Sequence, residues 1–135
     1  MNKTLESPYV NCSKISPDGY LFQADPSLGP KIIRKLKQGN YDLEATLDLH
    51  GCTVSQSEDA LEEFIQESLN DRLRCVLIIH GKGTQAILKN QVNTYLQYHS
   101  QVLAFCSAKP KDGGVGALYA LLKKQPSTGD DCEEE

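Results

Sequence analysis

The chain has 135 residues, of which 39% are hydrophobic and 24% are charged, and this length predicts a single domain with its own core. The formal net charge is −4, but five of the last six residues are acidic, so the rest of the chain is near neutral. Its lysines and arginines are clustered, and such clusters can bind phosphate. The five cysteines are scattered and form no C-x-x-C pair, which argues against a disulfide-rich protein. No apolar run approaches the ~20 residues of a membrane span, and the first residues do not form an apolar leader, which argues against membrane and secreted proteins. We therefore expect a cytoplasmic protein with no membrane partner.

The N-terminal part of the chain predicts an extension ahead of the main domain. Residues 1–26 are polar apart from a short apolar patch near Leu21, and they predict a flexible arm. Residues 27–44 predict a helical extension whose helix runs from Ser27 to Lys37. In this helix Ser27 is the expected cap, Pro30 suits the first turn, and Gly39 ends the helix.

Residues 45–124 predict the main domain. Strands are expected at 45–49, 74–79, 102–107 and 117–122, with a helix as the alternative for the last of these. Helices are expected from Ser55 to Leu69, where Ser55 and Glu58 form a capping box, and from Gln85 to Tyr98. The order β-α-β-α-β-β predicts an α/β fold, a two-layer sandwich with a mixed four-stranded sheet. Residues 125–135 predict a disordered acidic tail.

Two of the predicted strands end in a histidine followed by a glycine. The first reads Leu47-Asp48-Leu49-His50-Gly51, and the second reads Ile78-Ile79-His80-Gly81. Residues two apart in a strand share a face, so Asp48 and His50 project together. If the two strands are parallel neighbours, both histidines leave the sheet at its carboxyl edge, where α/β sheets bind ligands. The pattern predicts a site there, although satisfied structural histidines and a turn-anchoring Asp48 remain alternatives.

Glycine-rich segments next to this edge have the composition of a phosphate site. Gly81-Lys82-Gly83 precedes a predicted helix, so backbone amides, the helix N-terminus and the Lys82 ammonium would favour an anion. Gly51 follows the first histidine, and Gly113 and Gly114 lie in a third glycine-rich turn that either lines the same edge or is simply a turn. Two histidines and one aspartate fall short of a metal site, so no metal is predicted.

These residues suit acid–base cleavage of RNA. RNA carries its own nucleophile, so a histidine base (His50 oriented by Asp48), a second imidazole as acid (His80) and a cation (Lys82) would suffice. The roles of the two histidines are interchangeable at this level. DNA hydrolysis must activate water, which usually requires a divalent metal and more carboxylates than this edge offers.

Three segments in order, 47–51, 79–83 and 108–117, resemble the successive signatures of the Smr (small MutS-related) domain family, and the lead-in at 36–41 resembles its stand-alone bacterial members. The resemblance implies an α/β sandwich and a nicking endonuclease that acts on nucleic acid. It also implies an association of stand-alone members with stalled or collided ribosomes. Carried over by motif, Asp48 and His50 match the proposed catalytic pair, and residues 80–83 match the second active-site loop. The loop after Gly83 is shorter than in many relatives.

The sequence therefore predicts an endonuclease that cleaves RNA, with mRNA on stalled or collided ribosomes as the expected substrate. The expected catalytic residues are Asp48, His50 and His80, and the expected phosphate-binding residues are Gly51, Gly81, Lys82, Gly83, Gly113 and Gly114. Two alternatives stay open. One is metal-dependent nicking of DNA, and the other is a module that binds nucleic acid or ribosomes without cutting.

Overall fold

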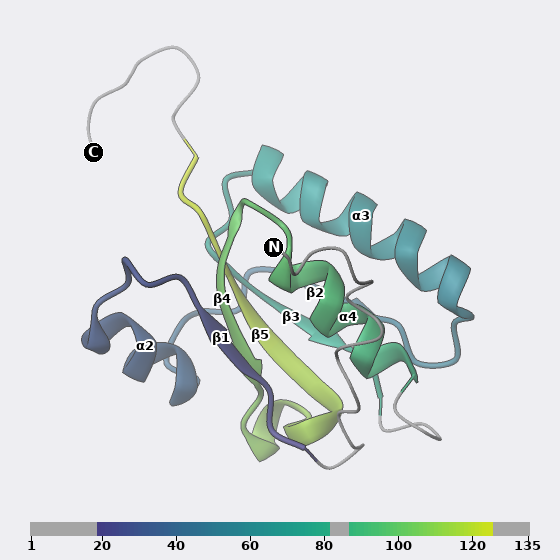
Figure 1. Cartoon of the computed structure of the whole chain (residues 1–135), viewed down its shortest axis with the longest axis horizontal. Helices are drawn as coiled ribbons and strands as arrows, with labels where there is room; N and C mark the ends of the chain where they lie inside the picture. The colour runs from purple at the N-terminus through teal and green to yellow at the C-terminus, as the bar shows by residue number, and fades with distance from the viewer. Residues whose placement is uncertain (1–18, 82–86, 126–135) are drawn as a thin grey trace, which may run out of the picture.

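The computed structural model describes residues 19–81 and 87–125, which form one mixed sheet with helices on both faces (Figure 1). The strands are β1 (Phe22–Ala24), β2 (Thr46–Asp48), β3 (Cys75–Ile79), β4 (Val102–Ser107) and β5 (Ala117–Leu122). The helices are α2 (Pro30–Lys37), α3 (Val54–Asn70) and α4 (Ile87–Gln97), and the short 3₁₀ turns are η2 (Pro110–Asp112) and η3 (Gly114–Gly116). Within this part of the chain, no helix is both long and apolar enough to cross a membrane.

The sheet has the order β1-β4-β5-β3-β2. Only β2 and β3 run parallel to each other, with Asp48 paired with Ile79, while β3–β5, β4–β5 and β1–β4 are antiparallel pairs. From β2 to β5 the elements follow the predicted β-α-β-α-β-β order, which confirms the α/β class. Because β2 and β3 are parallel neighbours, the chain leaves both strands at the same edge of the sheet.

The sheet is wider by one strand than the sequence predicts. β1 pairs with β4 through Phe22 and Cys106, so the sheet has five strands, and the prediction of four was wrong. The sequence shows only an apolar patch at this place. Three residues are too few for an alternating pattern, and the partner strand lies about eighty residues further along the chain.

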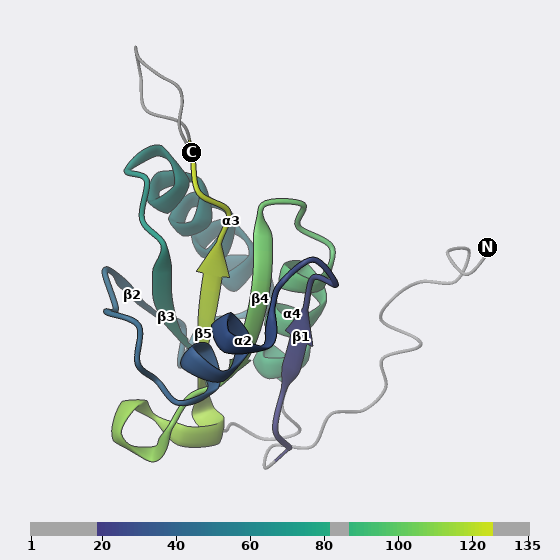
Figure 2. The same ribbon diagram turned by 90° about the vertical axis from the view of Figure 1, so that its left-hand side faces the viewer.

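Apolar side chains alternate between the two faces of the central strands. Val76 and Ile78 of β3 point into a core shared with α3 and α4, whereas Cys75 and Leu77 point into a second cluster that contains Leu36 of α2. Figure 2 shows α2 on one side of the sheet and α3 and α4 on the other. The helical extension thus covers the face that α3 and α4 leave open.

The starts of α2 and α3 differ from the predicted starts of these helices. α2 follows Gly29, which offers no side-chain cap, while Ser27 instead donates its backbone N–H to the Asp25 carboxylate at 2.9 Å. The capping box of α3 is made by Thr53 and Gln56, two residues before the predicted pair. Gln56 N–H donates to Thr53 Oγ1 at 3.1 Å, and Thr53 N–H donates to Gln56 Oε1 at 3.0 Å. The predictions at Ser27 and Ser55 were therefore wrong, because each stretch of sequence holds more than one residue that can cap a helix.

Candidate active site

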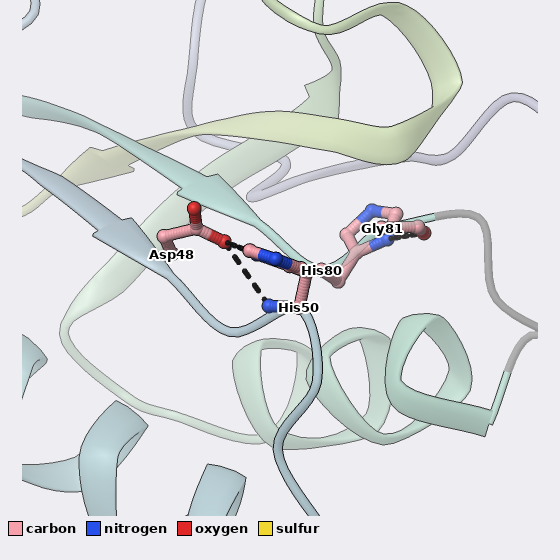
Figure 3. A network of polar contacts seen from close by, with 4 residues as sticks. All are labelled: Asp48, His50, His80 and Gly81. Atoms are coloured by element: carbon pink, nitrogen blue, oxygen red, sulfur yellow. Dashed lines mark hydrogen bonds and ion pairs between the residues drawn. The ribbon is translucent and has the colours of Figure 1, made fainter.

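Asp48 and His50 face each other where β2 ends (Figure 3). The Asp48 Oδ1 atom lies 2.8 Å from His50 Nδ1 and also accepts the His50 backbone N–H at 3.1 Å. The extended backbone puts the two side chains on one face, as the spacing of two predicts. The side chains are exposed, His50 at 75% and Asp48 at 50%, so the pair is open to a large ligand.

The two contacts favour the ionised form of Asp48 and decide which nitrogen of the His50 ring carries the hydrogen. Hydrogen bonds from the ring and the backbone of His50 lower the pKa of Asp48 below its usual value, so Asp48 is ionised at neutral pH. An ionised carboxylate only accepts, so His50 Nδ1 must carry the hydrogen. In the neutral ring Nε2 then has a free electron pair, which makes this nitrogen the proton acceptor.

His80 follows β3 at the same edge but is buried, with 2% of its surface exposed. Its Nδ1 atom lies 2.8 Å from the carbonyl oxygen of Gly81, which can only accept, so Nδ1 carries the hydrogen. Its Nε2 atom is buried without a hydrogen-bond partner among the described residues. Burial lowers the pKa of His80 to about 4, and nearby Lys89 acts in the same direction. The ring is therefore neutral at physiological pH.

Gly81 links the second histidine to the first. Gly51 and Gly81, the glycines that follow the two histidines, have the same positive φ of 83°, which disfavours other residues. A Cβ atom on Gly81 would lie 3.5 Å from His50 Cβ, so the turn after β3 packs directly against His50. The Gly81 N–H group donates to the Gly116 carbonyl at 2.8 Å, and the His80 N–H donates to the same oxygen at 3.0 Å. The amide of Gly81 is therefore already paired.

A partly buried network around Tyr119 holds the third glycine-rich turn in place. Tyr119 Oη donates to Asp112 Oδ2 at 2.5 Å and accepts the Lys109 N–H at 3.1 Å. Burial, with the hydrogen bond to Asp112, raises the pKa of Tyr119 to about 12, so the hydroxyl keeps its proton. Gly113 has a φ of 116°, and a Cβ there would lie 2.8 Å from the Ala117 Cβ, so only glycine fits.

Sequence reasoning missed the Tyr119–Asp112 bond and the Gly116 carbonyl. The only sequence signal for the network was the glycine-rich run that begins at Asp112, and neither the partner of a hydroxyl nor the direction of a carbonyl is visible in a residue pattern.

The structure brings most of the predicted site residues to one edge. Asp48, His50, His80, Gly51 and Gly81 lie at the ends of β2 and β3, and the turn that contains Gly113 and Gly114 reaches this edge through Gly116. The roles of all these residues stay predictions. The other two predicted residues, Lys82 and Gly83, lie outside the described residues. Within residues 19–81 and 87–125, no group of three or more His, Cys, Asp or Glu side chains could hold a metal ion.

The fold is similar to those of two solved bacterial structures. One is YdaL of Escherichia coli, a stand-alone small MutS-related protein, with a TM-score of 0.73, 36% identity and coverage of 82% of this chain and 88% of YdaL. The other is the Smr domain of Thermus thermophilus MutS2, with a TM-score of 0.56, 28% identity and coverage of 58% of this chain and 98% of that domain.

Relatives with similar sequences have Smr names. The probable DNA endonuclease SmrA of Escherichia coli is 39% identical over 98 residues, which cover 69% of this chain and 52% of SmrA. The ribosome rescue factor SmrB of Yersinia pseudotuberculosis is 32% identical over 127 residues, which cover 91% of this chain and 72% of SmrB. The chain thus spans about half the length of SmrA. The model of the Smr domain family matches residues 47–123, and the chain therefore belongs to the Smr domain family.

Proposed function

We propose that the chain is an endonuclease that cleaves RNA phosphodiester bonds, with Asp48 and His50 as its acid–base pair. The 2.8 Å contact between Asp48 Oδ1 and His50 Nδ1 carries this proposal, because it leaves His50 Nε2 as a proton acceptor on an exposed ring. RNA supplies its own nucleophile, so an oriented base is enough to start cleavage. A solvated surface pair with no chemical role would have no need of a fixed tautomer.

In the proposed reaction, His50 Nε2 takes the proton of the RNA 2′-hydroxyl. The 2′-oxygen then bonds to phosphorus, and the bond between phosphorus and the 5′-oxygen breaks. The upstream fragment keeps a 2′,3′-cyclic phosphate, and the downstream fragment leaves with a 5′-hydroxyl, whose oxygen takes a proton from the solvent at this exposed site. His50 then releases to the solvent the proton that it accepted. Asp48 stabilises the imidazolium that forms on His50, because its carboxylate accepts the hydrogen bond of Nδ1. The reaction as proposed uses no metal or organic cofactor.

We assign His80 a positioning role in place of the predicted role as proton donor. A donor must carry a second ring proton, and burial, which holds the pKa of His80 at about 4, opposes that state near neutral pH. Its Nδ1 bond to Gly81 steadies the turn that packs on His50. Lys82 remains our candidate for the cation that neutralises the phosphate, on the basis of the sequence alone.

The names of relatives support two substrates. SmrB is named as a ribosome rescue factor, which favours RNA on ribosomes as the substrate and the cytoplasm as the place of action. SmrA is named as a probable DNA endonuclease, which favours DNA as the substrate, the alternative that would usually require a divalent metal. We prefer RNA because the Asp48–His50 pair can activate a hydroxyl that is already part of the substrate, whereas DNA would require activated water.

The test uses labelled single-stranded RNA and DNA of the same sequence, incubated with the purified chain with and without EDTA, and the ends of the products are mapped. We expect RNA to be cut in EDTA and to yield 5′-hydroxyl ends. Cleavage that needs a divalent metal, or 5′-phosphate ends, would instead support hydrolysis at a metal. Binding of RNA or of ribosomes without any cleavage would support the binding module.

A further inference from the structure

The exposed side of α2 is basic throughout. The helix carries four cations and no acidic residue, and all four side chains are exposed: Lys31, Arg34, Lys35 and Lys37. Its apolar side, with Ile32 and Leu36, packs against the sheet. Among the described residues, no ion pair involves these four cations. In the described part of the chain, the helix thus presents four positive charges without an ion pair.

Two of these cations lie over aromatic rings at the surface. Lys37 Nζ is 4.1 Å from the centroid of Phe22, and Lys35 Nζ is 4.4 Å from the centroid of Tyr41. Phe22 is 40% exposed, so part of its ring remains open to a ligand. Cations interleaved with rings of this kind are typical of surfaces that hold single-stranded nucleic acid, where phosphates pair with the cations and bases stack on the rings. An acidic protein partner would have no need of the rings.

The end of α2 lies next to the candidate active site. A Cβ atom on Gly39, just after the helix, would lie 3.0 Å from Lys109 Cγ, so the helix end packs against the start of η2. Lys109 and Lys111 are exposed, and Lys111 Nζ lies 4.0 Å from Asp112 Oδ2. The turn continues to Gly116, whose carbonyl binds His80 and Gly81. Positive charge therefore extends from α2 along the turn to the edge that holds His50.

The opposite face of the molecule has the opposite charge. α3 carries five acidic residues and no cation: Glu58, Asp59, Glu62, Glu63 and Glu67. α2 and α3 lie on opposite sides of the sheet (Figure 1). A polyanion is repelled from the α3 side and attracted to the α2 side, so the charge distribution sets how a nucleic acid approaches.

We propose that a basic strip, defined as Lys31, Arg34, Lys35, Lys37, Lys109 and Lys111, binds the phosphate backbone of the RNA strand beyond the bond that is cut. The proposal rests on the proposed function only in taking RNA as the ligand. Four of these six residues precede the matched Smr region at 47–123, so the strip would extend the RNA-binding surface beyond the family's shared domain. The strip would favour long strands over short ones, because a short RNA in the active site would reach at most the end of α2 and not Lys31 and Arg34 nearer its start.

The test compares two exposed pairs of cations in the Asp48→Asn chain, where the proposed cleavage is slow enough for binding to be measured on intact RNA. K31Q/R34Q removes two charges from the strip, and K123Q/K124Q removes two charges next to the end of β5, at the opposite end of the sheet from His80. Fluorescence anisotropy measures binding to an RNA of about six nucleotides and to one of about 30 nucleotides over a range of salt concentrations.

We expect K31Q/R34Q to weaken binding of the long RNA and to reduce the slope of log K against log salt by about 1.4, because each phosphate of a single strand that is no longer neutralised lowers the slope by about 0.7. Binding of the short RNA and all binding by K123Q/K124Q should stay unchanged. Equal losses in both pairs, or none in K31Q/R34Q, would overturn the proposal even if RNA is cleaved. If K31Q/R34Q kept normal affinity for RNA but lost binding to ribosomes in a pelleting assay, the strip would belong to a contact with the ribosome surface and not with the RNA strand that is cut, which would also overturn the proposal. If the original chain cuts no RNA but K31Q/R34Q shows the expected losses, the proposed function fails while the strip stands.

Discussion

The burial of His80 predicts a specific dependence of stability on pH. In the unfolded chain a histidine has a pKa of about 6.5, whereas burial lowers the pKa of His80 to about 4. Between these two values the unfolded chain binds more protons than the folded chain does, so the free energy of unfolding falls as the pH falls. His80 therefore contributes stability that is present above pH 6.5 and is lost as the pH drops toward 4.

The size of the effect follows from the two pKa values. From pH 7.5 to pH 5 the unfolded histidine takes up nearly one proton, whereas folded His80 takes up only about a tenth of one. The free energy of unfolding should therefore fall by about 2 kcal/mol through His80 alone, since one pKa unit corresponds to about 1.4 kcal/mol. That is a large share of the stability of a small domain.

Urea denaturation at pH 7.5 and pH 5 measures this contribution. His99 is the other histidine whose pKa burial lowers, so the comparison uses the His99→Asn chain with and without His80→Asn. The chain that keeps His80 should lose about 2 kcal/mol more over this range than the chain that lacks it. If both chains lost the same free energy of unfolding and NMR showed the His80 ring to titrate near pH 6.5, a buried neutral His80 would be refuted. His80 would then again be a candidate proton donor.

Two further changes test the local structure around the site. Thr53→Ala removes the capping box of α3 and should lower the free energy of unfolding by about 1 kcal/mol, while Ser55→Ala, at the exposed position that the sequence pattern favours as the cap, should change it little. Tyr119→Phe removes the hydroxyl that holds Asp112 and should cost about 1–3 kcal/mol, while Tyr98→Phe, on a side chain that is 61% exposed, should be near neutral. Urea denaturation measures both pairs, and equal effects within a pair would contradict these assignments.

The sequence predicted the elements that have a strong local pattern. The continuous apolar run of β3 and the apolar spacing of α3 left few alternatives, and the glycine after each histidine marked both turns at the edge. The spacing of two between Asp48 and His50 was enough to predict that both side chains share a face. The predicted site required β2 and β3 to be parallel neighbours, and the structure confirms this pairing.

Features that depend on distant parts of the chain were not predictable in this way. β1 exists because β4 offers a partner, and His80 is neutral because the surrounding structure buries it. The sequence pattern of a histidine at the end of a strand is the same whether the ring is exposed, as in His50, or buried, as in His80. The sequence therefore predicted the candidate site residues but not the difference between its two histidines.

The central claim is that Asp48 orients His50 as the base that cuts RNA. The most direct measurement is the single-turnover rate of RNA cleavage in EDTA for Asp48→Asn, with Asp42→Asn as the matched control on an exposed aspartate before β2. We expect Asp48→Asn to slow cleavage on the order of 10²-fold or more, because the fixed tautomer of His50 is lost, while the control keeps the original rate. An original rate in Asp48→Asn, or an equal loss in the control, would contradict the claim.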